Sequence, residues 1–252
     1  AAYLDVIGGA LPGDPYGIDM PSKSYLSLIE HEPAALRVAV VHTPPDSGDV
    51  HPEIASLVRH VGEVLQTMGH EVAEHEMDLD GVAAWKNYTD MTCVETAGMF
   101  DFMETVVGQA VTQKDVEPVT WQIIQRGRAT SATDHVGRVE AVRQAGRAIV
   151  QDLQPFDVYL TPTLTQPPRP VGYYDMAMHD LDAYNALWSD SMFQFPFNIS
   201  GQPAISLPLG QAEGLPAGIQ LVARQGDEAR LLAVSAALER ALPWSDRKPM
   251  TP

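Results

Sequence analysis

The chain contains 252 residues, with 16 basic and 33 acidic side chains and a formal net charge of −17. This length suits one large domain or two small ones. The 45% of hydrophobic residues can form a sizeable core, which excludes a disordered tail and a small disulfide-stapled module. The acidity argues against nucleic acids and anionic membranes as partners, because both would be repelled. A single cysteine, Cys93, leaves no internal disulfide and favours a reducing cytoplasm.

The first seven residues predict a helix that ends at Gly8 and Gly9. A helix normally begins after a Ser, Thr, Asp or Asn whose side chain accepts from the free N–H groups, and none precedes Tyr3. We therefore expect the first turn of this helix to lie upstream, through truncation or processing. A frayed natural terminus, or removal of an initiator methionine, is the alternative.

The next segments predict a strand, a helix and a second strand. Residues 36–41 form a short apolar run typical of a buried strand, and residues 51–68 carry apolar side chains at helical spacing. Residues 70–77 alternate apolar and charged side chains, as in a strand near a sheet edge. A strand–helix–strand unit favours parallel pairing of its two strands.

The middle of the chain is predicted to be helical. Residues 81–113 form one helix with a break expected at Gly98 or Gly108, and residues 118–154 form one or two more. Arginines recur through this stretch. We interpret them as a solvated face paired with the abundant carboxylates, rather than as a binding surface: Arg126, Arg128, Arg138, Arg143 and Arg147.

The last third predicts more strands around an irregular loop. Residues 157–161 form a buried strand, and the loop at 162–178 holds four prolines and is long enough to border a site. A helix follows at 180–193. Further strands at 202–209 and 217–223, joined by a longer loop at 210–216, precede a closing helix at 228–242. No domain boundary is visible, so we expect an α/β fold with one mixed sheet flanked by helices.

The sequence offers no complete catalytic set. His and Glu residues crowd positions 70–76, but they alternate between the two faces of a strand and lack metal-ligand spacing, so an exposed polar strand is the better interpretation. Glycine-rich phosphate loops and a G-x-S-x-G elbow are absent. None of the four lysines lies in an apolar strand, where its ammonium could become a base. We therefore predict no metal, no cofactor and no catalytic residue in this chain.

The most specific segment spans residues 198–221. It reads N-x-x-G-x-P-A-x-S-x-P-x-G and then G-L-P-x-G-x-Q, a pattern of turns and small residues that by itself predicts a hairpin. Together with the D-V-Y-L-T-P-T run at 157–163, it resembles the carboxy-terminal hallmark of the amidase signature family. Gly226-Asp227-Glu228 and Gly13-Asp14-Pro15 fit as well, while residues 42–150 match only loosely.

The resemblance implies a chemistry whose parts this sequence lacks. Family members use a Ser–cis-Ser–Lys triad in which one serine attacks an amide carbonyl, and backbone N–H groups of a Gly/Ser-rich loop hold the oxyanion. Those parts belong to the amino-terminal half of the family, and no Gly-Ser-Ser-rich run occurs here. The chain therefore resembles the second half of an amidase, a single incomplete domain over residues 1–252.

The resemblance also implies where a substrate would lie. The loop after T-P-T and the helix before the Asn-x-x-Gly turn border the substrate in this family, and Asn198 is further expected to anchor that turn. An aromatic, apolar wall suits an aryl or alkyl amide of small size. The expected substrate-binding residues are Thr163, Leu164, Trp188, Met192, Phe193 and Asn198.

A missing half would leave apolar surface exposed along residues 203–223. We expect an amino-terminal amidase chain, cleaved or separately encoded, to pack there, and homo-oligomer formation is a further expectation.

Three functions compete. The first is half of a hydrolase of small carboxamides, which we favour. The second is half of a glutaminase-like subunit that supplies ammonia to an amidotransferase acting on aminoacyl-tRNA, and the third is a non-catalytic scaffold.

Overall fold

A five-stranded mixed sheet in the order β2-β1-β3-β5-β4 lies at the centre of the molecule. The computed structural model describes residues 1–46 and 48–248. Strand β1 (Arg37–Val40) pairs in parallel with β2 (Glu71–Glu74) on one side and β3 (Val158–Pro162) on the other. Strand β5 (Leu215–Ala223) pairs antiparallel with both β3 and β4 (Ala204–Ala212). The predicted fold class is confirmed.

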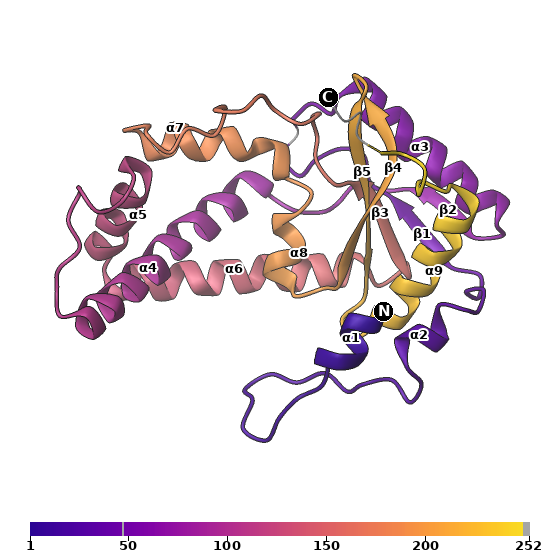
Figure 1. Cartoon of the computed structure of the whole chain (residues 1–252), viewed down its shortest axis with the longest axis horizontal. Coiled ribbons are helices and arrows are strands. Elements are labelled where there is room, and N and C mark those ends of the chain that lie inside the picture. The colour runs from indigo at the N-terminus through magenta and orange to yellow at the C-terminus, as the bar shows by residue number, and fades with distance from the viewer. Residues whose placement is uncertain (47, 249–252) are drawn as a thin grey trace.

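Helices cover both faces of this sheet, as Figure 1 shows. On one face, α3 (Pro52–Thr67) and α9 (Glu228–Ala241) bury their apolar sides against the strands. On the other face lie α6 (Ala132–Asp152) and α8 (Phe195–Ser200). The strand–helix–strand unit β1-α3-β2 has the predicted parallel pairing, and β2 is an edge strand as expected.

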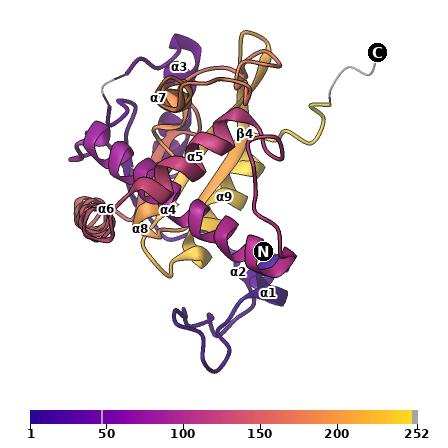
Figure 2. The same ribbon diagram turned by 90° about the vertical axis from the view of Figure 1, so that its left-hand side faces the viewer.

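A helical arm extends away from the sheet (Figures 1 and 2). It consists of α4 (Gly81–Val107), α5 (Pro118–Ala129) and the outer part of α6. Helix α4 runs through Gly98 without a break. It is capped by Gly108, the second of the two expected positions. The φ of Gly108 is 73°, a left-handed conformation that ends an α-helix and that glycine adopts without strain.

Ion pairs hold the arm together. The carboxylate of Asp90 on α4 is buried, and the cations of Lys86, Arg126 and Arg138 lie 2.8, 3.7 and 3.5 Å from it. Arg128 and Arg147 also pair with carboxylates, at 2.6–2.8 Å. For these four arginines the predicted pairing with carboxylates is confirmed. A buried carboxylate shared by three helices fixes how they pack, because losing one partner would leave an uncompensated charge.

Two segments differ from the prediction. The expected helix at 180–193 is instead α7 (Leu181–Ala186) followed by the 3₁₀ helix η1 (Leu187–Ser191). The predicted long hairpin loop at 210–216 is wrong, because β4 and β5 continue to a two-residue turn of Glu213 and Gly214. Both turn residues have positive φ, 52° and 74°, and such turns match the right-handed twist of the strands.

The amino-terminal segment lies at the surface. Helix α1 (Ala2–Ile7) buries none of its residues, and it is attached through Asp5, whose carboxylate accepts from the backbone N–H of Tyr25 and Leu26 in α2 (Tyr25–Leu28). Apart from the half-buried Leu4, its large apolar side chains are exposed, as are several of the following loop: Tyr3, Val6, Ile7, Leu11, Tyr16, Ile18 and Met20. The described residues contain no helix that is both long and apolar enough to span a bilayer.

Candidate functional site

Four polar side chains cross the sheet where β3 ends, and we call them the polar row: Thr161, Thr163, Ser206 and Gln220. Gln220 on β5 is the register partner of Thr161 on β3 and of Ser206 on β4, so these three lie on one sheet face. Thr163 follows β3, and its N–H donates to the carbonyl of Gly218 at 3.0 Å. The carboxyl end of a parallel strand is a common ligand position in α/β sheets.

The polar row is built from specific hydrogen bonds. Oγ1 of Thr163 and Oγ of Ser206 lie 2.6 Å apart. The buried amide of Gln220 donates through Nε2 to Thr161 Oγ1 at 3.1 Å and to the carbonyl of Phe193 at 2.8 Å. Gly218 is required beside them, because a Cβ there would lie 2.7 Å from each of the two paired hydroxyl oxygens.

The loop after β3 is fixed by an ion pair between Arg169 and the buried carboxylate of Asp190. Asp190 on η1 accepts two hydrogen bonds from the guanidinium of Arg169, at 2.6 and 2.8 Å, and its carbonyl accepts from the N–H of Thr165. This bidentate pairing raises the pKa of Arg169. The hydroxyl of Tyr174 lies 3.4 Å from the same carboxylate, and burial followed by that negative charge raises the pKa of Tyr174. The proline-rich loop is therefore held against η1.

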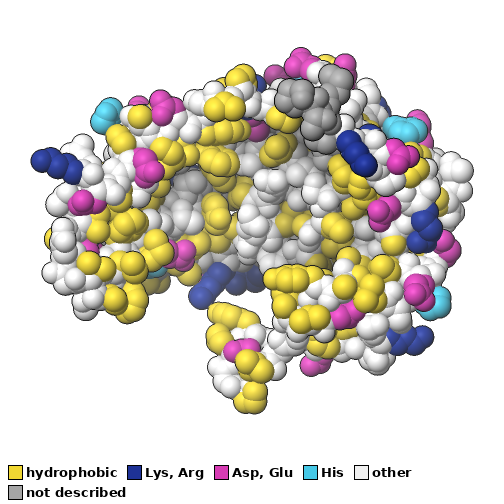
Figure 3. All heavy atoms as spheres, viewed as in Figure 1, with side chains coloured by type: hydrophobic (Ala, Val, Ile, Leu, Met, Phe, Trp, Pro, Cys, Tyr) yellow, Lys and Arg dark blue, Asp and Glu magenta, His cyan; other side chains and the backbone are white. Residues whose placement is uncertain are grey.

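An aromatic surface adjoins this loop. The rings of Tyr174 and Trp188 are 4.6 Å apart, and Tyr184 contacts Trp188 edge-on at 6.3 Å. Trp188 is 38% exposed and Leu164 is 36% exposed, so both present apolar surface to solvent. Figure 3 shows apolar side chains around the hollow between the arm and the sheet.

The other predicted site residues are less accessible. Phe193 is fully buried in the core between the sheet and α6, and Met192 packs with Ala84 and Phe195. The six predicted residues therefore differ in accessibility. Leu164, Trp188 and Asn198 are each exposed, Thr163 is half-buried, and Met192 and Phe193 are buried.

Asn198 is exposed on α8 and lines a cavity of about 350 Å³ with Gln194, Gln202 and Gln220. In the part of the chain the structure describes, no hydrogen bond joins its side chain to the turn that it was expected to anchor. Gln202 and Gln225 hold that turn instead, through Ser200 Oγ at 2.9 Å and the Ser200 carbonyl at 2.6 Å.

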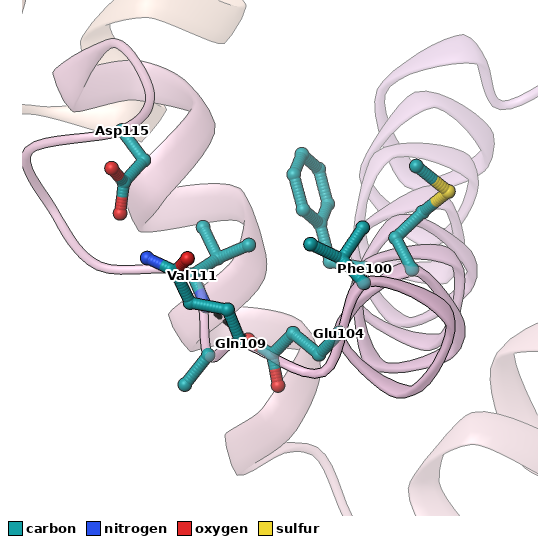
Figure 4. A pocket seen from close by; sticks show the side chains of 8 residues that line it. Phe100, Glu104, Gln109, Val111 and Asp115 are labelled. Carbon is teal, nitrogen blue, oxygen red and sulfur yellow. Dashed lines mark hydrogen bonds between the residues drawn. The ribbon is translucent and has the colours of Figure 1, made fainter.

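A second hollow lies at the tip of the arm (Figure 4). It has a volume of about 210 Å³ and is lined by apolar side chains including Phe100 and Val111. Its Glu104 carboxylate accepts from Arg128 and from the backbone N–H of Val111, both at 2.8 Å, and these bonds lower its pKa. The Glu104 carboxylate is thus used to close the arm, and the second carboxylate of the hollow, Asp115, accepts from the N–H and the hydroxyl of Thr112 at 2.8 and 2.6 Å.

Over residues 1–46 and 48–248, no serine hydroxyl is hydrogen-bonded to a lysine or histidine. All four lysines are exposed, and Lys86 pairs with Asp90. The buried hydroxyls of Ser191 and Ser200 donate to Trp188 O and Gln202 Oε1. The thiol of Cys93 is buried, which raises its pKa and disfavours the thiolate. A pair of nucleophile and base is therefore missing from the described residues.

Sequence reasoning missed the residues that organise the site. Gln220, Arg169 and Asp190 hold the sheet and the loop together, but their partners lie 21–59 residues away in the chain. One available signal was the buried position of a glutamine in an otherwise apolar strand, since a buried amide needs partners.

Comparison with known proteins shows which family this chain resembles in sequence. A family model described as Amidase matches residues 1–232. The chain is 35% identical to 6-aminohexanoate-cyclic-dimer hydrolase from a Pseudomonas species, over 99% of this chain and 52% of that protein. It is 27% identical to a glutamyl-tRNA(Gln) amidotransferase subunit from Roseiflexus castenholzii, over 99% and 53%.

Comparison with solved structures gives relatives of the same kind. A structure of 6-aminohexanoate cyclic dimer hydrolase superimposes with a TM-score of 0.90 at 31% identity, covering 99% of this chain and 54% of that one. A bacterial aryl acylamidase shares the fold, with a TM-score of 0.79 at 19% identity over 96% of this chain and 50% of its own. The chain spans about half the length of the curated relatives it matches. On the match over residues 1–232, the chain belongs to the amidase family.

Proposed function

We propose that this chain is the carboxy-terminal portion of an amide hydrolase that works through a serine acyl-enzyme. It supplies the substrate-pocket wall and part of the sheet, as one incomplete domain, and an amino-terminal polypeptide supplies the reacting serine and lysine. The observation that carries this proposal is the match of nearly the whole chain to about half of each amide-hydrolysing relative, joined to the lack of a serine–lysine couple among the described residues.

The surface supports a partner of this kind. Strand β4 is an edge strand of nine residues without a single charged side chain, whereas the opposite edge, β2, carries Glu71 and Glu74. Charged residues on an edge discourage further pairing, and an uncharged edge invites it. The exposed apolar side chains of residues 3–20 add surface on the same chain that a partner would cover.

The expected exposed surface along 203–223 needs a correction here. Strand β5 is mostly buried, and none of the exposed side chains of β4 is large and apolar: Ala204, Ser206, Pro208 and Gln211. Partner contact at β4 would therefore use its backbone edge more than a broad apolar face, with the amino-terminal segment supplying the larger apolar side chains.

We infer that the substrate is a small uncharged carboxamide. Leu164, Trp188 and Asn198 would contact it, and Met192 and Phe193 would support that surface from beneath. A glutaminase-like role would need a free charged group to grip an amino acid. The cation at this surface, Arg169, already pairs through two hydrogen bonds with Asp190, which favours the neutral amide.

The test mixes this chain with the part of the Pseudomonas relative outside the match, which in this proposal is its amino-terminal half. Hydrolysis of neutral aryl and alkyl amides is followed alongside hydrolysis of glutamine. We expect turnover of the neutral amides by the mixture and none by either half alone. Turnover by this chain alone would contradict the proposal, as would an inactive mixture, which is the outcome expected of a non-catalytic scaffold.

A further inference from the structure

The Gln220 amide has hydrogen-bonding capacity that the chain does not use. Its orientation is fixed, because the carbonyl of Phe193 can only accept, and Thr161 Oγ1 already donates its hydrogen to the carbonyl of Pro162 at 2.7 Å. Both Nε2 hydrogens are therefore committed. Among the described residues nothing donates to Oε1, although Gln220 is only 6% exposed and lines the cavity beside α8. What remains is a fixed acceptor.

The hydroxyl pair of Thr163 and Ser206 contributes the opposite capacity. Two hydroxyls carry two hydrogens, and their mutual bond of 2.6 Å uses one of them. The second hydrogen remains available, because no other acceptor is bound to either oxygen within the described part of the chain. Ser206 is exposed, so this donor is open to a ligand at the sheet surface.

The surroundings define the class of ligand. The cavity beside Gln220 is lined by neutral groups, namely the amides of Gln194, Asn198 and Gln202 with Phe197 and Ala204. A protein with a net charge of −17 that keeps this surface free of carboxylates is not selecting a cation, and without arginine or lysine it does not select an anion. One fixed acceptor and one free donor match the N–H and C=O of a peptide unit.

We propose that the polar row seats a main-chain segment of the amino-terminal half. Oε1 of Gln220 accepts a backbone N–H of that segment, and the free hydroxyl hydrogen of the Thr163–Ser206 pair donates to one of its carbonyls. This inference rests on the proposed function, since it takes the partner from there. Among the described strands, β4 has a neighbour on one side only, and its residues carry no charge, so its outer edge gives such a segment a path beside Gln220.

The experiment measures the dissociation constant between this chain and the amino-terminal half of the Pseudomonas relative, with amide hydrolysis as a second readout. We expect the double variant Thr163→Val/Ser206→Ala to weaken association roughly fivefold, because it removes one hydrogen bond to the partner, worth about 1 kcal/mol, and about 1.4 kcal/mol corresponds to tenfold. Thermal unfolding of the variant chain alone checks that it is folded.

Gly218→Ala provides a second route to the same loss. It keeps both hydroxyls, but its Cβ would lie 2.7 Å from each oxygen and would force the pair apart, so association should weaken as well. The matched control is Ser56→Ala/Thr133→Val, which removes two exposed hydroxyls from α3 and α6 and should bind like wild type.

The outcomes separate the two proposals. If the wild-type halves neither associate nor hydrolyse amides, the proposed function itself fails. If the halves associate and the hydroxyl variants bind as tightly as wild type, only the proposal that the polar row binds main chain is overturned. Unchanged association with a raised KM would also overturn it, because the pair would then contact substrate rather than main chain.

Discussion

His70 is buried where its sequence context, a polar strand, indicated an exposed residue. Its Nδ1 accepts from the backbone N–H of Leu36 at 3.2 Å, and its Nε2 is buried without a partner in the described structure. The ring is therefore neutral, with its hydrogen on Nε2, because protonating Nδ1 would set two donors against each other. Burial lowers the pKa of His70, and the negative charge of Glu32 opposes that shift only in part.

This pKa makes the stability of the chain depend on pH. The unfolded chain titrates His70 near its ordinary pKa of about 6.5, and the folded chain titrates it lower, so between these values the unfolded state binds more protons. The contribution is complete above about pH 6.5 and is lost as the pH falls toward the folded pKa. We expect wild type to lose more unfolding free energy between pH 7 and 5 than His70→Asn, measured by urea denaturation. Parallel profiles would contradict this.

The polar row shows which site residues a sequence can and cannot reveal. Thr163 and Trp188 were expected at the site because the family resemblance implies that the loop after T-P-T and the helix before the Asn-x-x-Gly turn border the substrate. Gln220 is equally visible in the sequence, but its role depends on Phe193 and Thr161, which approach it only through the pairing of β3 and β5. Local pattern predicts the element that carries a side chain and leaves its partners undetermined.

At the scale of elements, the spacing of apolar residues predicted the long helices but not the short helix and the tight turn. Helices α3 and α9 have clear apolar stripes against the sheet. The hairpin turn was missed because Glu213 adopts a positive φ, which a non-glycine residue rarely does, and its N–H donates to Glu53 at 2.6 Å. Helix α8 has six residues and was hidden behind a motif that predicts only a turn.

The packing of α4 against α5 leads to a prediction about glycine. A Cβ at Gly127 would lie 2.1 Å from the carbonyl oxygen of Cys93 and 2.7 Å from Cβ of Ala97, so the two helix backbones touch there. We expect Gly127→Ala to lower the unfolding free energy by about 1–3 kcal/mol, because the helices must separate. Thermal and urea unfolding measure it.

The matched control for this prediction is Gly137→Ala in α6. Gly137 has open space around its Cβ position, so alanine should stabilise the helix by about 0.5–1 kcal/mol. Equal effects of the two substitutions would show that helix propensity, and not the close approach of α4 and α5, decides the outcome.

For the whole molecule, the two edges of the sheet differ in a way that matters for assembly. Strand β2 is four residues long and has a glutamate at each end, whereas β4 runs for nine residues with no charge and one proline. Unpaired backbone on a long uncharged edge is a template for another strand. The amino-terminal half would occupy it in the proposed enzyme, and without that half a second copy of the chain can.

We therefore expect the isolated chain to self-associate through β4 in a concentration-dependent way, measured by sedimentation velocity. Gln211→Lys places a charge on the exposed part of β4 and should shift the chain toward monomer, because lysine on an edge strand disfavours pairing. Gln113→Lys adds the same charge on the arm and should leave association unchanged.

Adding the amino-terminal half of the Pseudomonas relative should compete with self-association. A wild-type chain that stays monomeric at every concentration, or a Gln211→Lys variant that associates as strongly as wild type, would show that β4 is not the contact.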